Sequence, residues 1–161
     1  NLIEELKKAN SGIKFSSDFI IGYPGETDDD FNKTIRLLKE VEFINCFSFI
    51  YSARPGTPAA RLKNINDTVA KKRLIEFQKV AYEIKMKYRR SLFGKKTQVL
   101  FENKSKNKGE YFGRDEYSNS VITKSNKCLK GKIQEIKIID GNQNTLFGEY
   151  DQKINNEDFA A

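Results

Sequence analysis

Apolar residues in the first half of the chain follow two alternating patterns. In three segments they recur every three or four positions, as on one face of a helix: residues 2–9, 31–41 and 67–92. Two other segments read as strands: residues 14–22, whose apolar part Phe19-Ile20-Ile21 is typical of a buried parallel strand, and residues 43–52, which are rich in aromatic residues and Ile. This alternation predicts α/β architecture, with parallel strands joined by right-handed helical crossovers.

Local signals support the second and third helices. Thr27 can cap a helix together with Asp30, in a variant of the capping box, and the acidic residues 28–30 suit the positive end of that helix. The spacing over residues 67–92 also fits a coiled coil, but about three heptads are short for one, and a helix packed on a barrel wall is preferred. Because two strands cannot close a barrel, we expect residues 1–92 to be an incomplete domain.

The pattern changes near residues 91–94. Five short strand-like runs follow, separated by Gly, Asn, Asp and Ser: KKTQVLFE, GEYFGR, SVITK, GKIQEIKIID and NTLFGEY. A hairpin signal stands at Asp140-Gly141. Five strands in so short a segment predict a small β-barrel over residues 93–150. Residues 151–161 read as a polar tail.

Charge points to polyanionic partners without identifying one. Lys and Arg number 29 against 22 Asp and Glu, a net charge of +7. In residues 93–150 lysines alternate with aromatic residues, as on small barrels that hold phosphates and stack bases. A solvated lysine face above aromatic core residues explains the same pattern, and both interpretations stay open.

The reactive residue types are few. The chain has no histidine and two distant cysteines, Cys46 and Cys128. This composition excludes a zinc site of the ordinary type, a histidine-based triad and a cysteine-ligated iron–sulfur cluster within this chain. Acid–base chemistry would have to come from carboxylates, Lys or Tyr. Two unpaired thiols, and the absence of a long apolar stretch, predict a cytoplasmic protein without a membrane anchor.

Two Gly/Pro loops follow the predicted strands, at residues 22–26 and 54–58. Ligands of parallel βα architectures bind where strands end and loops begin. Glycine permits close approach of a flat ligand, Glu26 can accept hydrogen bonds from a sugar hydroxyl, and Arg54 can pair with a carboxylate. Alternatively, the first loop is only a tight turn with Glu26 at a helix start, and Arg54 forms a surface ion pair. No phosphate-binding glycine motif is present.

Taken together, SSDFIIGYPGETDDDF and FSFIYSARPGTPAA resemble the radical-SAM methylthiotransferases, most of all the MiaB-type tRNA enzymes. The FGR, NSV and NTLFGEY segments of the second half resemble their TRAM domain. This resemblance implies the end of a radical-SAM (β/α) barrel at residues 1–92, an OB-like TRAM barrel at 93–150, and a chain that is a C-terminal piece of a longer protein.

The resemblance also implies roles for individual residues. Those expected at the S-adenosylmethionine site are Ile20, Gly22, Pro24, Gly25, Glu26, Ser52, Arg54, Gly56 and Thr57. Those expected to bind RNA are Lys95, Lys96, Arg114, Asn119, Lys124, Lys130 and Lys132. No catalytic residue and no metal ligand is expected in this chain.

The implied reaction adds a methylthio group to isopentenyladenosine beside the tRNA anticodon, using S-adenosylmethionine and two 4Fe-4S clusters. The cluster-binding cysteines of the family are absent, so we expect this chain to be inactive alone. The expected partners are the anticodon stem-loop and an electron donor, and the expected state is a monomer. Two alternatives are a methylthiotransferase acting on threonylcarbamoyl-adenosine or a ribosomal protein, and a bare RNA-binding module.

Overall fold

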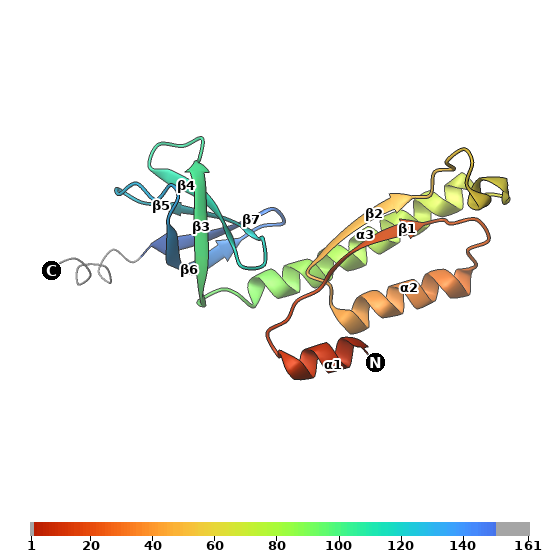
Figure 1. Cartoon of the computed structure of the whole chain (residues 1–161), viewed down its shortest axis with the longest axis horizontal. Helices are drawn as coiled ribbons and strands as arrows, with labels where there is room; N and C mark the ends of the chain where they lie inside the picture. The colour runs from red at the N-terminus through yellow and green to blue at the C-terminus, as the bar shows by residue number, and fades with distance from the viewer. Residues whose placement is uncertain (1, 151–161) are drawn as a thin grey trace. The chain divides into compact units, whose positions relative to one another are not determined.

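The computed structural model describes residues 2–150, which form two compact units, one up to Lys85 and the other from Met86 on (Figure 1). The polar tail predicted for residues 151–161 lies outside the described residues. Among the described helices, none combines the length and the apolar character needed to cross a membrane.

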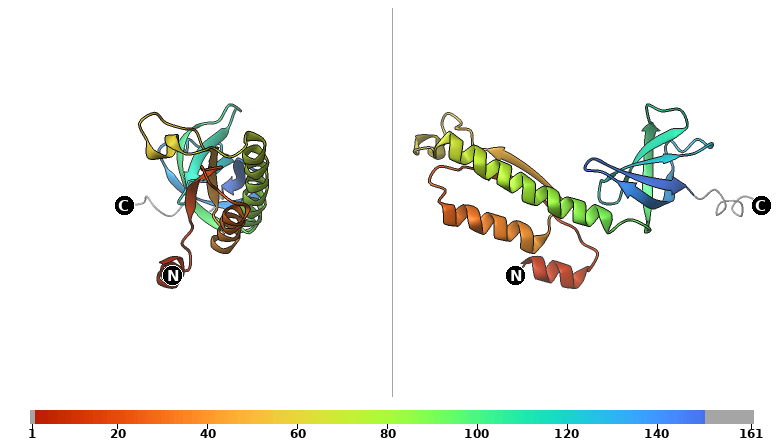
Figure 2. Two further views of the ribbon diagram at one scale, coloured as in Figure 1. Left: turned by 90° about the vertical axis from the view of Figure 1, so that its right-hand side faces the viewer. Right: turned by 180° about the vertical axis from the view of Figure 1, so that it is seen from behind.

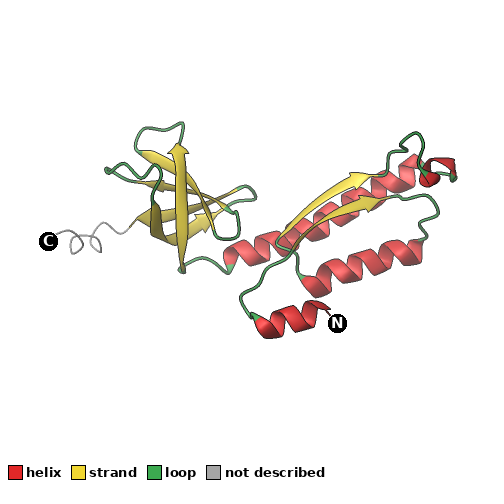
Figure 3. Cartoon of the chain, viewed as in Figure 1, coloured by secondary structure: helices red, strands yellow, loops and turns green. Residues whose placement is uncertain are grey.

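The first unit contains two parallel strands and the helices that follow them (Figure 3). Its elements are α1 (Leu2–Ala9), β1 (Ser16–Ile21), α2 (Asp28–Val41), β2 (Asn45–Ile50), the short 3-10 helix η1 (Pro58–Arg61) and α3 (Asp67–Arg90), whose last turn belongs to the second unit. The strands pair in register from Ser16 opposite Asn45 to Ile21 opposite Ile50. The predicted parallel pairing is therefore confirmed.

Helices α2 and α3 cover one face of this sheet. The core consists of Ile21, Phe31, Ile35, Leu38, Val41, Phe43 and Phe77, with Phe19, Leu74, Ala81 and Ile84 packed against it. Phe77 of α3 is fully buried, and its ring lies 4.8 Å from that of Phe19. Removing a phenylalanine from such a core costs about 3–5 kcal/mol. The helical spacing seen in the sequence thus corresponds to real buried faces.

Within residues 2–150 only one of the two faces of the strands is covered. Ile20, Phe47 and Phe49 are 59%, 62% and 57% exposed. Side chains alternate between the two faces of a strand, and both long helices lie on the face of Phe19 and Ile21. The opposite face, which carries Ile20 and Phe49 opposite each other, is open.

Helix α2 begins as the sequence predicts. The Thr27 hydroxyl accepts a hydrogen bond from the Asp30 backbone N–H at 3.2 Å, and the Asp30 carboxylate accepts one from the Thr27 N–H at 3.1 Å. These two bonds complete the capping box. Hydrogen bonds from the Thr27 side chain and backbone lower the pKa of Asp30. The first strand is thus followed by a sharply defined helix start.

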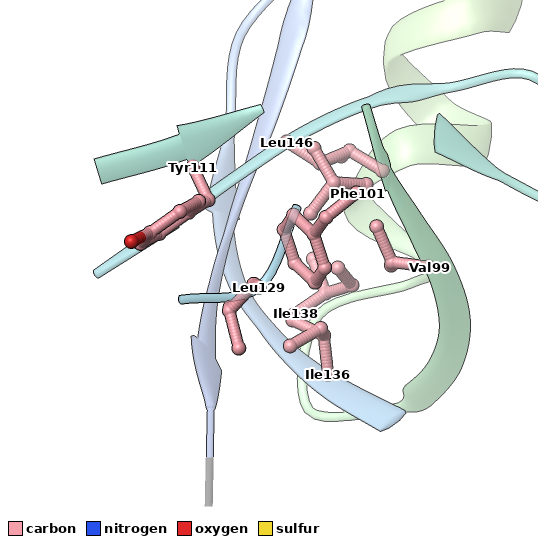
Figure 4. Packing of buried hydrophobic residues seen from close by; sticks show 8 residues of the cluster. Val99, Phe101, Tyr111, Leu129, Ile136, Ile138 and Leu146 are labelled. Carbon is pink, nitrogen blue, oxygen red and sulfur yellow. The ribbon is translucent and has the colours of Figure 1, made fainter. Parts of the chain in front are cut away.

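The second unit is a closed five-stranded barrel, as expected (Figure 2). Its strands are β3 (Lys96–Lys104), β4 (Glu110–Asp115), β5 (Ser120–Lys124), β6 (Ile133–Gly141) and β7 (Thr145–Tyr150). They close in the order β3-β4-β5-β7-β6, and only β5 and β7 pair in parallel. Figure 4 shows the buried side chains that fill the barrel: Val99, Phe101, Tyr111, Val121, Leu129, Ile136, Ile138 and Leu146.

The hairpin between β6 and β7 exists, but its turn lies later than predicted. Strand β6 continues through Asp140 to Gly141, with a register shift after Ile138. The Asn142 side chain makes the turn instead, because its oxygen accepts hydrogen bonds from the backbone N–H groups of Asn144 and Thr145, both at 2.9 Å. An Asx turn therefore replaces the Asp-Gly turn.

The last turn of α3 packs into the barrel unit. Arg89 is 3% exposed, and its guanidinium donates to the backbone oxygen of Asn142 at 2.8 Å. The hydroxyl of Tyr88 accepts a hydrogen bond from the Asn119 amide at 3.5 Å. Burial raises the pKa of Tyr88 to about 12, so this hydroxyl stays protonated. The barrel is thus capped by residues that precede its first strand.

Candidate functional sites

The two Gly/Pro loops lie together where β1 and β2 end. The backbone N–H of Tyr51 donates to the oxygen of Ile21 at 2.9 Å, and the rings of Tyr23 and Tyr51 meet edge to face at 5.2 Å. This arrangement follows from the parallel pairing, since parallel strands end at the same edge of a sheet. Both loops therefore begin at the same edge of the sheet.

The first loop is a turn closed from Tyr23 to Glu26. The Glu26 N–H donates to the Tyr23 oxygen at 2.9 Å, with Pro24 second and Gly25 third in the turn. Gly25 has φ +84°, which is the conformation a type II turn requires at its third residue. The second loop repeats this pattern, because the Thr57 N–H donates to the Arg54 oxygen at 3.2 Å. Both loops are therefore built turns.

Gly22 is required for a second reason. It has φ +77°, and a Cβ atom placed there would meet the Cβ of Ala70 at 2.9 Å and Ile65 at 3.3 Å. Ala70 lies in the first turn of α3 and is buried. The backbone of the loop therefore packs directly on α3, with no space for a side chain.

Glu26 is held inside its own loop. One carboxylate oxygen accepts from the backbone N–H of Gly22 at 3.0 Å, and the other accepts from the guanidinium of Arg73 at 2.7 Å. Arg73 also donates to the backbone oxygen of Glu26 at 3.0 Å and to the Asp28 carboxylate at 2.6 Å. The Glu26 carboxylate, which could accept a hydrogen bond from a sugar hydroxyl, therefore already accepts hydrogen bonds from two groups of the protein.

Arg73 was not singled out from the sequence. It lies on α3 three residues after Ala70 and four before Phe77, so helical spacing places it on the buried face. That spacing was the available signal. Burial opposes its charge, but the hydrogen bonds to Asp28 and Glu26 outweigh this and raise the pKa of Arg73. It stays a cation at any physiological pH.

Several predicted cofactor-side residues line one pocket at this edge. The pocket has a volume of about 560 Å³ and is lined by Ile20, Phe49, Ile50, Tyr51, Ser52, Arg54, Thr57 and Ala59. Ile20 and Phe49 form an apolar wall, and Ser52 and Arg54 add polar groups. The hydroxyl of Tyr51 is buried and has no hydrogen-bond partner among residues 2–150. Such a pocket suits a flat aromatic ring joined to polar, charged substituents.

The remaining predicted residues of this site lie outside the pocket lining: Gly22, Pro24, Gly25, Glu26 and Gly56. Gly22 and Pro24 are buried, and Glu26 faces Arg73. These residues shape the loops behind the pocket. Within residues 2–150, no group of three or more His, Cys, Asp or Glu residues is placed to hold a metal ion.

The two cysteines lie in different environments. Cys46 is half-buried in β2, and burial raises the pKa of its thiol to about 11. Cys128 is exposed in the connection between β5 and β6. A hydrogen bond between Cys128 and the hydroxyl of Tyr111 contributes, after burial, to raising the pKa of Tyr111.

On the barrel, the residues predicted to bind RNA fall into groups that differ in availability. Lys95, Lys124, Lys130 and Lys132 are exposed. Lys96 pairs with Glu135 at 2.6 Å, and Arg114 pairs with Glu102 at 3.3 Å and lies over the ring of Phe112. Asn119 is 2% exposed, and its amide donates to the Asp115 carboxylate at 2.8 Å. Asn119 therefore ties the β4–β5 turn together.

A second group of lysines, not predicted individually, lies close to the exposed ones. The loop from β3 to β4 and the connection from β5 to β6 are neighbours, since the Ser125 N–H donates to the Gly109 oxygen at 2.9 Å and Glu110 of β4 lies opposite Lys124 of β5 in the sheet. We call their lysines the lysine rim: Lys104, Lys106, Lys108, Lys124, Lys127, Lys130 and Lys132. No acidic residue interrupts residues 103–109 or 124–132. The rim is a concentrated positive surface.

A groove on the side of the barrel is electrostatically different. It has a volume of about 730 Å³ and an apolar floor that includes Ile122 and Phe147. Its charged residues are Lys96, Lys124, Lys137, Glu110, Glu135 and Glu149. Strand pairing places these charges in a row around the barrel, in which positive and negative side chains are mixed. The lysine rim is the better surface for a polyanion.

Known proteins match both halves of the chain. Residues 90–150 match the TRAM domain family. The chain is 47% identical over 146 residues to a tRNA-2-methylthio-N(6)-dimethylallyladenosine synthase of Pelagibacter ubique, covering 91% of this chain and 33% of the relative. Proteins of the same name from Shewanella frigidimarina and Ehrlichia ruminantium (strain Gardel) are 43% and 40% identical, covering 93% and 92% of this chain but 32% and 34% of those relatives. The chain spans about one third of the length of these curated relatives.

Proposed function

We propose that this chain is the C-terminal part of a MiaB-type tRNA methylthiotransferase, because it is similar to curated members of that family over nine tenths of its length and spans about one third of theirs, and because residues 90–150 match the TRAM domain family. The whole enzyme adds a methylthio group to isopentenyladenosine beside the anticodon of tRNA. The observation that carries this proposal is the similarity across nine tenths of the chain, which includes both loops and the barrel.

In this proposal the first unit is the end of a radical-SAM barrel, and its pocket holds part of S-adenosylmethionine. Ile20 and Phe49 present the apolar wall for the adenine ring, while Ser52 and Arg54 bind polar groups of the cofactor. When bound, the cofactor and two 4Fe-4S clusters supply the radical chemistry and the sulfur. Residues of this chain bind, orient and exclude water from the reacting groups.

The clusters are held outside this chain, since its two cysteines cannot supply their ligands. This chain alone is therefore inactive. The full-length enzyme is a cytoplasmic monomer that receives electrons from a separate donor. The monomeric state and the electron donor can be tested on the purified full-length enzyme, the inactivity on this chain alone, and the location by fractionating cells.

We assign docking of the anticodon stem-loop to the lysine rim. Lysines in exposed positions can each approach a phosphate and release a counterion, and residues 103–109 and 124–132 contain no carboxylate. The nearest one, Glu110 at the start of β4, accepts a hydrogen bond from the Asn107 amide at 2.9 Å. Lys95 adds an exposed charge at the start of β3. The amide of Asn119 is buried and engaged by Asp115, so we leave it out of this interface. Lys96 and Arg114 would first have to leave their carboxylate partners.

RNA docking is tested by fluorescence anisotropy with an anticodon stem-loop at several salt concentrations. Replacing Lys106, Lys108, Lys127 and Lys130 with Gln should weaken binding and flatten the salt dependence, by about 0.7–0.9 in the log–log slope for each phosphate that is no longer neutralised. The matched control replaces exposed lysines of the first unit, with an equal change in net charge: Lys39, Lys63, Lys71 and Lys72. Equal weakening in both variants would show that only net charge matters.

The reaction itself is tested by a chimera. This chain replaces the matching third of the Pelagibacter ubique relative, and tRNA nucleosides from cells that lack the native enzyme are analysed by mass spectrometry. We expect 2-methylthio-isopentenyladenosine to appear. A folded chimera that leaves isopentenyladenosine unmodified would contradict the assignment. A methylthio group on threonylcarbamoyl-adenosine would instead identify the neighbouring branch of the family.

A further inference from the structure

On the premise of the function proposed above, we propose that Arg73 is a positioning residue for S-adenosylmethionine. It acts through Glu26, whose carboxylate it fixes, and so holds the loop of residues 22–26 in the shape that borders the cofactor pocket. Nothing in the sequence motif of that loop includes Arg73, which lies on α3, far along the chain.

The contacts of Glu26 show how the loop depends on Arg73. The Arg73 guanidinium donates hydrogen bonds to the Glu26 carboxylate at 2.7 Å and to the Glu26 backbone oxygen at 3.0 Å. The other carboxylate oxygen then accepts from the Gly22 N–H at 3.0 Å. Gly22 comes two residues after Ile20 of the pocket wall. Arg73 therefore holds the Glu26 carboxylate in place, and that carboxylate in turn holds the backbone of Gly22 next to the pocket.

Burial makes this arrangement difficult to replace. The side chains of Arg73 and Glu26 are only 9% and 11% exposed, so water has little access to substitute for either. The second arm of the guanidinium reaches Asp28 at 2.6 Å, and its plane lies near the ring of Phe31. Three donor positions pointing to three acceptors require the planar fork of arginine, which lysine lacks.

Glu26 itself does not line the pocket, whereas Ile20 does. Its effect on a bound cofactor must therefore pass through the backbone of the loop. This separates Glu26 and Arg73 from residues that touch the cofactor directly, such as Arg54 in the proposal above. A loosened loop should weaken cofactor binding without altering contacts to RNA.

The first measurement is amide hydrogen exchange at Gly22 in this chain. Arg73→Met removes both bonds to Glu26 and should speed exchange at the Gly22 amide by about tenfold, because the amide loses a fixed charged acceptor. Arg73→Lys should give an intermediate value. Because Arg73→Met leaves Glu26 buried without a counter-charge, the double variant with Glu26→Gln is also measured. Lys72→Met, a change at an exposed neighbour on α3, is the control.

The second measurement is equilibrium binding of S-adenosylmethionine to the full-length enzyme that carries this segment. We expect Arg73→Met to raise the dissociation constant about tenfold and to leave binding of the anticodon stem-loop unchanged. Ile35→Val, a conservative change in the same core, controls for a simple loss of stability.

The outcomes separate the two proposals. If Gly22 exchange is unchanged in Arg73→Met, or if cofactor affinity falls no further than in Ile35→Val, the positioning role is refuted. If the wild-type enzyme does not bind S-adenosylmethionine at all, the proposed function fails first. Faster exchange together with selectively weaker cofactor binding supports both.

Discussion

Replacing Gly22 with alanine tests the packing of the first loop on α3. The new methyl group carries two costs. The left-handed backbone at φ +77° disfavours an L residue by about 1–2 kcal/mol. The methyl group would also lie 2.9 Å from the Cβ of Ala70, and Ala70 belongs to helix backbone that cannot move aside cheaply. Overpacking of this kind costs about 1–3 kcal/mol.

Gly25 provides a matched control in the same loop. Its φ of +84° is nearly that of Gly22, but a Cβ atom there would meet nothing within 4 Å. Gly25→Ala should therefore carry only the backbone cost of about 1–2 kcal/mol. The difference between the two variants isolates the steric cost against Ala70, about 1–3 kcal/mol.

The assay is urea unfolding followed by the helical signal, since α1, α2 and α3 all begin in the first unit. Equal slopes against urea are needed before the midpoints are compared. A third variant, Gly22→Ala with Ala70→Gly, removes the atom that the new methyl group meets and should recover part of the stability. Equal destabilisation by Gly22→Ala and Gly25→Ala, with no recovery in the double variant, would refute the packing argument.

Three further predictions concern single groups. At about pH 8, iodoacetamide should label the exposed Cys128 and spare Cys46, whose half-buried thiol has a pKa raised to about 11. Mass spectrometry of the intact chain shows the number of labels. Rapid labelling of both cysteines would contradict the burial of Cys46. Cap hydrogen bonds lower the pKa of Asp30 in the folded state, so its carboxylate stabilises the chain above the ordinary pKa of 3.8, and this effect is lost as the pH falls below that value and through the lowered one. The difference in stability between wild type and Asp30→Asn should therefore be constant near neutral pH and should shrink on acidification below 3.8. A difference that stays constant in acid would be inconsistent with the cap. Arg89→Met should lower the free energy of unfolding of the barrel unit by about 1–3 kcal/mol, because the Asn142 oxygen loses its donor. The melting temperature of that unit should fall by several degrees. An unchanged thermal transition would argue against this hydrogen bond.

Local features of the sequence determined much of the fold. Apolar spacing was sufficient to find the helices, because α2 and α3 bury one stripe each, and the five barrel strands alternate clearly between inside and outside. The capping box at Thr27 and the turns at Pro24 and Pro55 depend on residues within four positions of one another. Such interactions can be seen in the sequence because they need no partner from elsewhere in the chain.

Contacts between distant segments were decided only by the tertiary structure. Arg73 and Glu26 are 47 residues apart, and only the packing of α3 beside the loop brings them into contact. Two other differences are local: the Asn142 side chain, and not Asp140-Gly141, closes the turn between β6 and β7, and Asn119 is a buried tie to Asp115 four residues away. In both cases nearby residues offered several polar groups, and proximity alone did not show which of them would be used. The lysine rim exists because the barrel brings two loops together. Sequence proximity determines turns and caps, whereas which polar group meets which across the chain depends on how the core packs.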